Sequence, residues 1–599
     1  MQRTILAALA VSVGLVLWPQ FEAIAAEETR IGKTIGDFTL RDYRGAEHSL
    51  SDFGDSKLVV VAFLGTECPL VKLYAPRLEE MANRLAAEGV AFVGINSNRQ
   101  DSHTKVASYA RQHGITFPVL KDASNEIADR FGAVRTPEVF VLDADRVVRY
   151  WGRIDDQYGV GIQRKEPTRQ DLAVAIDELL AGREVSEPVT QAPGCFIGRI
   201  ARVAPHGEVT YSNQIVRILE KRCVECHRTG EIAPFPLRTY EDVAGWAEMI
   251  REVVEGGRMP PWFANPEYGH FANDARLTEE EKQLINQWVD NGAPEGDPAD
   301  MPELRQFAEG WQIPQPDAVY YISDEPVSIP AEGTVEYQNF TVDPGFTEDK
   351  WVVAAEARPG NRAVVHHIIV FITDANGDGG PASTRQRGAI IGYAPGMQAR
   401  MLPEGVGIHV PAGAKLSFQM HYTSCGSEQQ DRSYVGLVFG DASKIRQELR
   451  GGVVGNLNVD IPAGAENHEM KARYRFRKDM IVTSLLPHMH LRGKSFRFEA
   501  DYPDGTHEVL LDVPRYDFNW QLWYEFATPK LIPKGTVVRC TAHYDNSADN
   551  LMNPDPTINV HWGEQTWEEM MFGFYTGLDP AQDLTKRPDS DEVATESGG

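Results

Sequence analysis

The chain has 599 residues, enough for about three to five domains of ~100–200 residues each. Hydrophobic residues make up 42% and charged residues 24% of the sequence, which is the balance of globular domains with packed cores. The formal net charge of −27 argues against nucleic acid and anionic membrane surfaces as partners, and six cysteines are too few for a disulfide scaffold.

The N-terminus has the layout of a secretory signal peptide. Arg3 precedes an apolar run over residues 5–18, and a small-residue sequence follows at residues 23–25. The run is short for a membrane anchor, which needs ~20 residues, so we expect cleavage and assign residues 1–26 to the signal peptide. No later segment is apolar enough to cross a bilayer. The sequence therefore predicts a periplasmic or secreted protein with no stable membrane span.

Strand and helix patterns alternate over residues 27–186, which predicts an α/β domain. The apolar run at residues 57–65 reads as a buried strand, and helical periodicity follows it in PLVKLYAPRL. Cys68 therefore lies at a strand-to-helix turn, where a helix N-terminus lowers the pKa of a thiol. Thr136-Pro137 resembles the cis-proline site of thioredoxin folds. The domain is similar to the redoxin group of thioredoxin-like and peroxiredoxin-like proteins.

The thiol motifs of that group are incomplete in this sequence. Val71 replaces the second cysteine of a C-x-x-C motif, and Thr66 stands only two residues before Cys68, so the T-x-x-C spacing of peroxiredoxins is not met. Cys68 remains a candidate catalytic thiol of the one-cysteine peroxidatic or mixed-disulfide type, with Cys195 as a candidate resolving partner. A scaffold retained without thiol chemistry is the alternative.

Residues 187–302 lack strand patterns and predict a small all-α domain. Its last helix is expected to start at Thr278, with Glu281 completing a capping box. The sequence Cys223-Val224-Glu225-Cys226-His227 is a C-x-x-C-H motif, in which two cysteines attach the haem vinyl groups and the histidine reaches the iron. The alternatives are a lone disulfide and half a zinc site. A zinc site would need two more nearby ligands, and none is obvious in the sequence.

The same segment resembles small class I-like cytochrome c domains, in which a downstream M-P loop supplies the axial sulfur. The resemblance implies one haem c held by Cys223, Cys226 and His227. Met259, in the loop GRMPPW, is the expected sixth ligand. Met249 and His270 are weaker alternatives for that position, and Met259 as a core residue is the other reading.

From about residue 315 the sequence changes to short strands between Gly, Pro, Asn and Asp turns, which is typical of β-sandwiches. The acidic, proline-rich stretch PEGDPADMPEL is the expected linker before them. We expect two all-β domains, at residues 303–455 and 456–580, followed by a polar, disordered tail at residues 581–599.

Three histidine clusters lie in this β region. His488 and His490 share one face of a strand, because side chains alternate along it, so both can reach one metal ion. His366 and His367 are adjacent, so joint ligation requires a bulge or a local twist. His421 stands alone in LSFQMHYTS. Spacing alone does not establish a site, because a single strand histidine is more often a core or surface residue.

The order and neighbours of these clusters resemble the copper type II, ascorbate-dependent monooxygenases, which include peptidylglycine α-hydroxylating monooxygenase and dopamine β-monooxygenase. The matching runs are VVHHIIVF, LPEGVGIHVPAGAKLSFQMHY, PHMHLRGKSF and TWEEMMFGFY, and they occur in family order. The resemblance covers residues 315–578 and implies two jelly-roll-like domains with one copper ion each.

By position, the resemblance assigns two sets of copper ligands. An electron-transfer copper would be held by His366, His367 and His421. The catalytic copper, which binds dioxygen in the family, would be held by His488, His490 and Met570. Imidazole suits both oxidation states of copper and a thioether stabilises Cu(I). Met571, Met552 and Met489 are alternatives for the thioether ligand. Gln419 matches a family position between the two copper sites.

Two positions depart from the peptidylglycine enzyme. Leu486 stands two residues before His488, where that enzyme has arginine, and Phe574 stands four residues after Met570, where it has tyrosine. Recognition of a peptide carboxylate, and hence peptide amidation, is therefore not expected. The family is rich in disulfides, whereas this β region holds only Cys425 and Cys540. The sequence leaves open whether these two cysteines form a disulfide.

Together these features predict an exported copper monooxygenase that hydroxylates a C–H bond of a small-molecule or peptide substrate with O2. Two copper ions and one haem c are the expected cofactors. Electrons would come from an external one-electron donor through the fused haem, in place of ascorbate or beside it. The alternatives are a non-catalytic copper and haem electron-transfer protein, and a thiol peroxidase based on Cys68.

Overall fold

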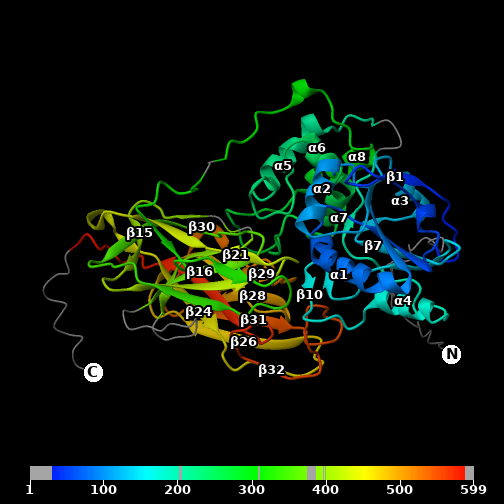
Figure 1. Cartoon of the computed structure of the whole chain (residues 1–599). Helices are drawn as coiled ribbons and strands as arrows, with labels where there is room; N and C mark the ends of the chain where they lie inside the picture. Colours follow the sequence, from blue (N-terminus) through cyan, green and yellow to red (C-terminus); the bar gives the residue numbers. More distant parts are fainter. Residues whose placement is uncertain are drawn as a thin grey trace, which may run out of the picture.

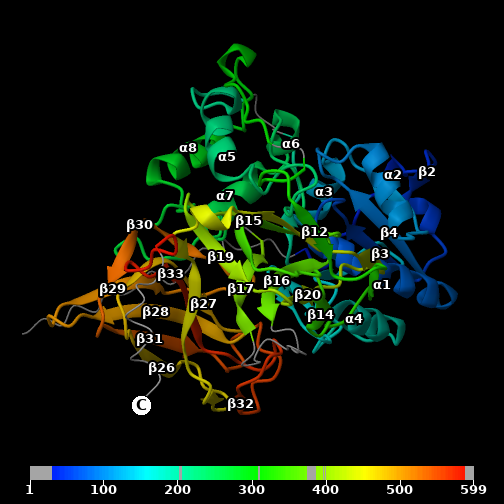
Figure 2. The same cartoon turned by 90° about the vertical axis from the view of Figure 1, so that its left-hand side faces the viewer.

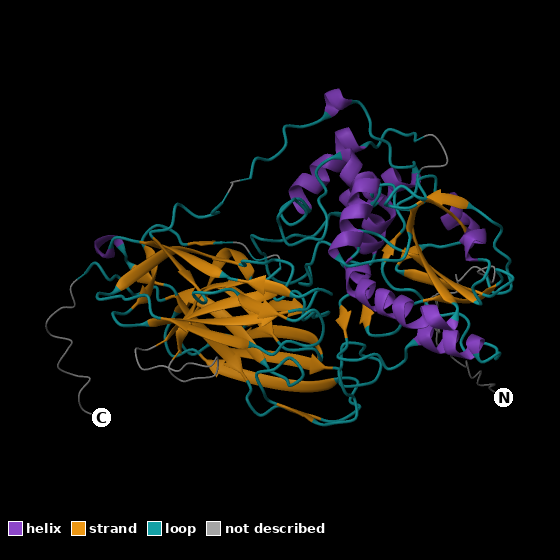
Figure 3. Ribbon diagram, in the orientation of Figure 1, coloured by secondary structure: helices purple, strands orange, loops and turns teal. Residues whose placement is uncertain are grey.

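The computed structural model describes residues 30–586, except 201–204, 308–309, 374–385, 396 and 398. The signal peptide expected at residues 1–26 lies outside the described residues, as does the tail from residue 587 onward. Figure 1 shows an α/β and helical half in blue to green beside a β half in green to red, and Figure 3 shows the same division as purple helices and orange strands. No helix in the described part of the chain is long and apolar enough to span a membrane.

The first domain is a five-stranded sheet covered by helices on both faces. Its strand order is β5-β4-β3-β7-β8. Strands β3, β4 and β5 pair in parallel, whereas β7 pairs antiparallel with β3 and β8 pairs antiparallel with β7. All six residues of β3 are buried, as expected for a central strand between two helical layers. The strands are β3 (Leu58–Phe63), β4 (Val90–Asn96), β5 (Val119–Lys121), β7 (Glu138–Leu142) and β8 (Val148–Gly152). The helices are α1 (Pro69–Leu85), α2 (His103–Gln112), α3 (Glu126–Phe131) and α4 (Asp171–Leu180).

The next region contains short helices packed around two buried tryptophans, Trp246 and Trp288. The helices are η3 (Tyr211–Ile215), α5 (Val216–Arg222), α6 (Tyr240–Ala244), α7 (Ala247–Glu255) and α8 (Glu279–Asp290). The capping box predicted for α8 is confirmed. The Thr278 hydroxyl accepts a bond from the Glu281 N–H (3.1 Å), and the Glu281 carboxylate accepts one from the Thr278 N–H (2.8 Å).

The β half consists of two units, each with two larger sheets around one apolar core. Figure 2 shows them side by side below helices α5 to α8. The main strands of the first unit are β12 (Ala318–Tyr321), β14 (Gln338–Val342), β15 (Lys350–Arg358), β16 (Val365–Thr373), β17 (Gln386–Tyr393), β19 (Val406–Val410), β20 (Lys415–Tyr422) and β22 (Tyr434–Phe439). Those of the second are β24 (Arg450–Gly455), β26 (His468–Arg475), β27 (Met480–His488), β28 (Gly493–Asp501), β29 (His507–Val513), β30 (Tyr524–Ile532), β31 (Val537–Tyr544) and β33 (Phe572–Leu578).

Hydrogen bonding places two short segments across the expected domain boundaries. Strand β24 pairs with β33 along its whole length, so it belongs to the second β unit although the expected boundary follows it at residue 456. Strand β11 (Cys195–Phe196) pairs with β6 (Arg135–Thr136) of the first domain, beyond the expected boundary at residue 187. Both assignments depend on contacts between residues far apart in the chain, which local patterns do not encode.

The loop after α7 leaves the helical region and joins the second β unit. Trp262 and Phe271 are buried in the core of that unit, where both rings contact Tyr524 at centroid distances of 4.8 and 5.6 Å. The Ala272 N–H donates to the Glu525 carbonyl (2.7 Å). The helical region is therefore anchored to the β half by apolar packing as well as by backbone hydrogen bonds.

Candidate metal centres and a buried thiol

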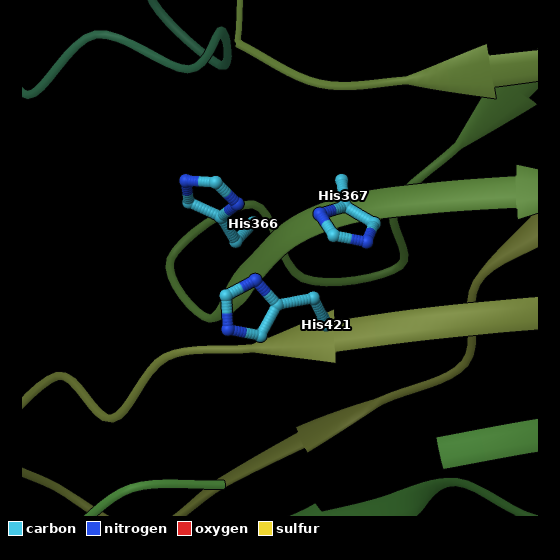
Figure 4. A group of neighbouring side chains, drawn as sticks. All are labelled: His366, His367 and His421. Atoms are coloured by element: carbon cyan, nitrogen blue, oxygen red, sulfur yellow. The ribbon is translucent and has the colours of Figure 1, made fainter. Parts of the chain in front are cut away.

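The first histidine cluster forms where β16 pairs with β20. The register of this antiparallel pair shifts between Val365 and His367, so His366 lies in a bulge, and His367 stands directly opposite His421. A bulge redirects one side chain, which allows two consecutive histidines to serve one site. One ring nitrogen of each histidine lies within 4.8 Å of the others, and Figure 4 shows the three rings gathered at the end of the two strands. The bulge that joint ligation requires is present.

The three rings are held as neutral imidazoles with free nitrogens. His366 Nδ1, His367 Nε2 and His421 Nδ1 are buried and have no hydrogen-bond partner. Burial lowers the pKa of His366 to about 4 and lowers the pKa of His367 and His421 well below the usual value, with their histidine neighbours adding to the effect. Neutral imidazoles with converging lone pairs are the form that binds a metal ion.

His488 and His490 form a second pair at the end of β27. The His488 Nδ1 is 2.7 Å from the Gln521 Oε1, and the His490 Nδ1 is 3.1 Å from the Glu568 carbonyl oxygen. Such partners fix a ring so that its other nitrogen is available for a metal. The His490 Nε2 is indeed buried without a partner. Burial lowers the pKa of His488 to about 4 and that of His490 to about 3.

The methionines near this pair differ in their surroundings. Met489 and Met571 are fully buried in the apolar core of the second β unit, and Met552 packs against the same core. Met570 is 8% exposed and is not part of that core. Met571 belongs to that core, whereas its neighbour Met570 is buried outside it. Of the four residues, Met570 is the one whose sulfur the core packing leaves free for a site.

Glu569 connects this methionine to the histidine pair, and sequence reasoning missed it. Its carboxylate accepts hydrogen bonds from the N–H groups of His490 (2.8 Å) and Arg492 (2.7 Å). The residue is fully buried, and burial raises its pKa to about 7, although the backbone donors oppose the rise. Met570 is its direct neighbour in sequence, so this clamp holds the Met570 segment against the turn that carries His490.

The two histidine sets face each other across one aromatic ring. The ring of Phe518 is stacked 5.9 Å from that of His366 and lies 6.1 Å from that of His421 and 6.0 Å from that of His490, measured between centroids. Tyr337 closes the other side of the first set, with its ring 4.8 Å from that of His421. Neither aromatic residue was singled out from the sequence, because each contacts the histidines only through the fold.

The wall beside His488 is apolar. Leu486 and Phe574 stand directly opposite each other on β27 and β33, and the rings of Phe572 and Phe574 lie 6.5 and 6.0 Å from the His488 ring. The two positions that depart from the peptidylglycine enzyme are therefore one cross-strand pair. Gln419 is buried on β20, two residues before His421. Cys425 and Cys540 are free thiols that pack with the cores of different β units.

The C-x-x-C-H motif follows the end of α5, with Cys223 as the helix C-cap. The His227 Nδ1 lies 3.1 Å from the Phe235 carbonyl oxygen, which leaves the other ring nitrogen available to a metal. Cys223 and Cys226 are free, and burial raises the pKa of their thiols to about 12 and about 11. The two thiols are therefore not joined in a disulfide.

The loop after α7 carries the expected sixth ligand. Met259 is half-buried there, and its N–H donates to the Val253 carbonyl (3.1 Å). Met249 packs in the helical core instead, and the His270 carbonyl accepts a hydrogen bond from Ala527 of the second β unit. Of the two methionines, Met259 is the one outside the helical core, and its role as a haem ligand stays a prediction.

An ion pair connects the C-x-x-C-H segment to the first histidine cluster. Glu231, four residues after His227, binds Arg362 at 3.0 Å, and Arg362 is four residues before His366. The Arg362 guanidinium also lies 5.7 Å from the ring centroid of Tyr393, which pairs with β16 on the adjacent strand. The segment expected to carry haem therefore docks on the loop that leads into the three-histidine cluster.

Cys68 is the N-cap residue of α1 and is fully buried. Its sulfur lies 3.1 Å from the Thr136 carbonyl oxygen, and the Thr136-Pro137 peptide bond is cis, as the sequence predicts. Cys195 stands directly opposite Thr136 on the paired strand, so its thiol is a neighbour of Cys68. Burial raises the pKa of Cys68, but the hydrogen bonds from Cys195, Val71 and Thr136 outweigh it and bring the pKa to about 6.

A five-stranded sheet with a buried thiol beside a cis-proline defines a thioredoxin-like domain. Residues 31–151 match the AhpC/TSA family, and the N-terminal domain belongs to it. Thiol-disulfide oxidoreductase ResA of Geobacillus thermodenitrificans is 28% identical over 174 residues, which are 29% of this chain and 92% of ResA. Chloroplastic peroxiredoxin Q of Sedum lineare is 29% identical over 134 residues, or 21% of this chain and 70% of that protein.

A solved structure of a hypothetical protein from Sinorhizobium meliloti 1021 shares 37% identity, covers 28% of this chain and 95% of its own, and has a TM-score of 0.27. The family match lies in the N-terminal part of a chain that continues into helical and β units. The protein is thus a multidomain oxidoreductase in its general class, with a redoxin domain at its N-terminus.

The buried histidines predict that the metal-free protein loses stability in mild acid. His490 has a folded-state pKa of about 3, below the usual 6.5, so the unfolded chain takes up this proton first and stability falls as pH drops below 6.5. At pH 5 the expected loss is about 2 kcal/mol for this residue. Differential scanning calorimetry at pH 7 and pH 5 should give a larger fall in Tm for the metal-free wild type than for His490→Leu.

Glu569 acts in the opposite direction, because its raised pKa adds stability as pH falls through about 7. The fall in Tm between pH 7 and pH 5 is therefore compared between proteins that all keep Glu569. The control is His409→Leu, which removes a partly exposed histidine that pairs with Asp349. Equal pH sensitivity in His490→Leu and the wild type would show that His490 is not held neutral by the fold.

Proposed function

We propose that the β half is an exported copper-dependent monooxygenase, which hydroxylates a C–H bond of a small-molecule or peptide substrate with O2. The observation that carries the proposal is the three-histidine cluster, whose ring nitrogens converge within 4.8 Å and lack protein partners. Hydroxylation by O2 consumes two electrons and two protons and releases water, so it needs a protein that gathers single electrons. A signal peptide would put this reaction in the periplasm or outside the cell.

The donor sets fit copper. His366, His367 and His421 would hold one ion, and His488, His490 and Met570 would hold the other. Copper bound at these two sets would supply one-electron transfer and activation of dioxygen. Converging imidazoles suit both oxidation states, and an added thioether favours Cu(I). The chain orients these donors through the β16 bulge and through the carbonyl and amide partners of the second pair.

The residues around the second set determine what it can accept. Leu486, Phe572 and Phe574 form an apolar wall beside His488, and the position of a carboxylate-binding arginine is occupied by leucine. An apolar wall excludes water and favours an uncharged group next to the site. This supports a substrate whose reacting carbon carries no neighbouring carboxylate, and it argues against peptide amidation.

The fused helical region would hold one haem c through Cys223, Cys226 and His227, with Met259 as the sixth ligand. Haem bound there would supply one-electron transfer from an external donor. The chain's own contribution is the docking of this segment by the Glu231–Arg362 ion pair beside the three-histidine cluster. That proximity supports electron delivery from the haem side to the β half.

Removal of either histidine set should remove one copper ion. The copper-loaded wild type is expected to hold two ions per chain by elemental analysis, and His421→Ala and His488→Ala one each. Both variants should lose O2 uptake across a panel of apolar substrates. His409→Ala is the matched control and should keep two ions and full uptake. One ion or none in the wild type would overturn the ligand assignment.

Loss of the docking ion pair should slow electron delivery. Glu231→Gln removes an ion pair worth about 0.2–1 kcal/mol, which lowers the docked population by at most about fivefold. Stopped-flow absorbance after haem reduction should then record slower reoxidation of the haem by Cu(II). The control is Glu225→Gln, which lies within the C-x-x-C-H motif but pairs with Arg305. Haem that is reduced in the wild type and never reoxidised by copper would contradict electron feed.

Thiol chemistry at Cys68 is the second candidate function, and the comparisons with known proteins support it more directly. The N-terminal domain matches the AhpC/TSA family, and its relatives include a thiol-disulfide oxidoreductase and a peroxiredoxin. The pKa of about 6 keeps Cys68 largely as the reactive thiolate at neutral pH. A non-catalytic copper and haem electron-transfer protein remains the third option, distinguished by metal binding without O2-dependent product.

The thiol function and the copper function separate by mutation. Cys68→Ser should abolish consumption of hydrogen peroxide in the presence of a dithiol reductant, because the attacking thiolate is gone. His488→Ala should leave that consumption unchanged and should abolish substrate-dependent O2 uptake instead. Peroxide consumption that survives Cys68→Ser in copper-free, haem-free protein would rule out Cys68 as the peroxidatic residue.

A further inference from the structure

The segment around Cys195, which follows the redoxin sheet in the sequence, packs along the loop that carries the cis-proline. Strand β11 pairs antiparallel with β6, which puts Cys195 directly opposite Thr136. The N–H of Ile197 donates to the Val134 carbonyl, and the N–H of Gly198 donates to the Asn98 Oδ1, both at 2.9 Å. These bonds flank Cys195 on its C-terminal side and hold it over the buried Cys68.

Gly194 makes the close approach on the other side possible. Its φ of +116° is a conformation that favours glycine, and a Cβ there would stand 2.2 Å from the Thr136 carbonyl oxygen. The Arg135 guanidinium donates to the Gly194 carbonyl at 2.7 Å. The position of Cys195 is therefore fixed by a specific backbone path.

The two thiols are neighbours on either side of Thr136, and their pKa values shift in opposite directions. Burial raises the pKa of Cys68, but the side chain and backbone of Cys195, together with Val71 and Thr136, bring it down to about 6. The hydrogen bond to Cys68 and burial raise the pKa of Cys195 well above its usual value. Cys68 is thus the thiolate of the pair, and Cys195 keeps the proton.

We propose that Cys195 is the redox partner of Cys68 and that the two form a reversible disulfide across the cis-proline loop. This inference rests on the thiol function proposed for Cys68. The Cys68 thiolate attacks the terminal oxygen of a hydroperoxide, so an S–O bond forms as the O–O bond breaks and Cys68 becomes a sulfenic acid. The leaving oxygen takes up a proton and departs as an alcohol, or as water from hydrogen peroxide. The Cys195 sulfur then attacks the sulfenic sulfur, the S–S bond forms and water leaves. A dithiol reductant returns both thiols.

The disulfide would also connect two regions of the molecule. Cys195 packs against the redoxin core and against the helical core that surrounds the C-x-x-C-H motif. Arg135 of β6 binds Glu252 of α7 at 2.6 Å beside it. In the reduced protein β11 is held by hydrogen bonds and packing, whereas the oxidised protein ties this junction covalently to the N-terminus of α1.

Peptide mapping of the full-length protein tests the proposal. The protein is treated with one equivalent of hydrogen peroxide, alkylated without reduction and digested with trypsin. The expected product links the peptide of residues 58–72 to that of residues 184–199, and a dithiol abolishes the link. Cys425→Ser should form the same product, and Cys195→Ser should instead accumulate a sulfenic acid on Cys68 that dimedone labels. A wild type without the linked peptides overturns the proposal.

Gly194→Ala tests the geometry with both cysteines present. Its Cβ meets the Thr136 carbonyl, so the yield of linked peptides should fall, while dimedone labelling of Cys68 should rise. Gly182→Ala is the matched control, because that glycine also has a positive φ but faces open space. An unchanged yield of linked peptides in Gly194→Ala would contradict the role of Gly194 in placing Cys195 beside Cys68.

Peroxide consumption is measured on the same samples, so failure of the proposed peroxidase function can be distinguished from failure of the proposed Cys68–Cys195 disulfide. Linked peptides without sustained peroxide consumption would keep the disulfide and remove the peroxidase function. Sustained consumption without linked peptides would keep the peroxidase function and remove Cys195 as its partner.

Discussion

The pairing of β16 with β20, and the bulge within it, is the constraint on which the three-histidine cluster depends. Val365, Ile368, Val370 and Ile372 are buried in the core of the first β unit and fix the register of β16. A regular strand with this register would direct His366 and His367 to opposite faces. The bulge lets the core keep its apolar residues while both imidazoles reach His421.

Each redox candidate lies where two parts of the molecule meet. Cys68 and Cys195 lie where the redoxin sheet contacts the helical region, and the Glu231–Arg362 pair joins the helical region to the first β unit. Phe518 of the second β unit stands between the two histidine sets. Electron transfer and thiol exchange both need close approach, so an arrangement with the reactive groups at the junctions supports transfer along one chain.

Local sequence was sufficient for the parts whose signal lies within a few residues. The buried strand before Cys68, the cis bond at Pro137, the capping box at Thr278 and the need for a bulge at His366 all follow from short patterns and backbone rules. Their physics is local, because each depends on the alternation of side chains, on the conformational preference of proline or on a cap within one helical turn.

The remaining parts of the sites depend on contacts that no local pattern encodes. Glu569 binds the backbone of His490 from 79 residues away, and Gln521 reaches His488 across 33 residues. The placement of Cys195 opposite Thr136 and of β24 on β33 likewise follows from pairing between distant segments. Composition says only that such residues are polar or small, and the fold decides what they contact.

The energetics of the histidine sets argue that they are retained for a reason other than stability. Four of their ring nitrogens are buried without partners, and a buried unsatisfied polar group costs about 1–3 kcal/mol. An apolar residue at each position would remove that cost, as Leu486 and Phe574 do beside His488. A ligand that accepts these lone pairs, as proposed for copper, would offset that cost.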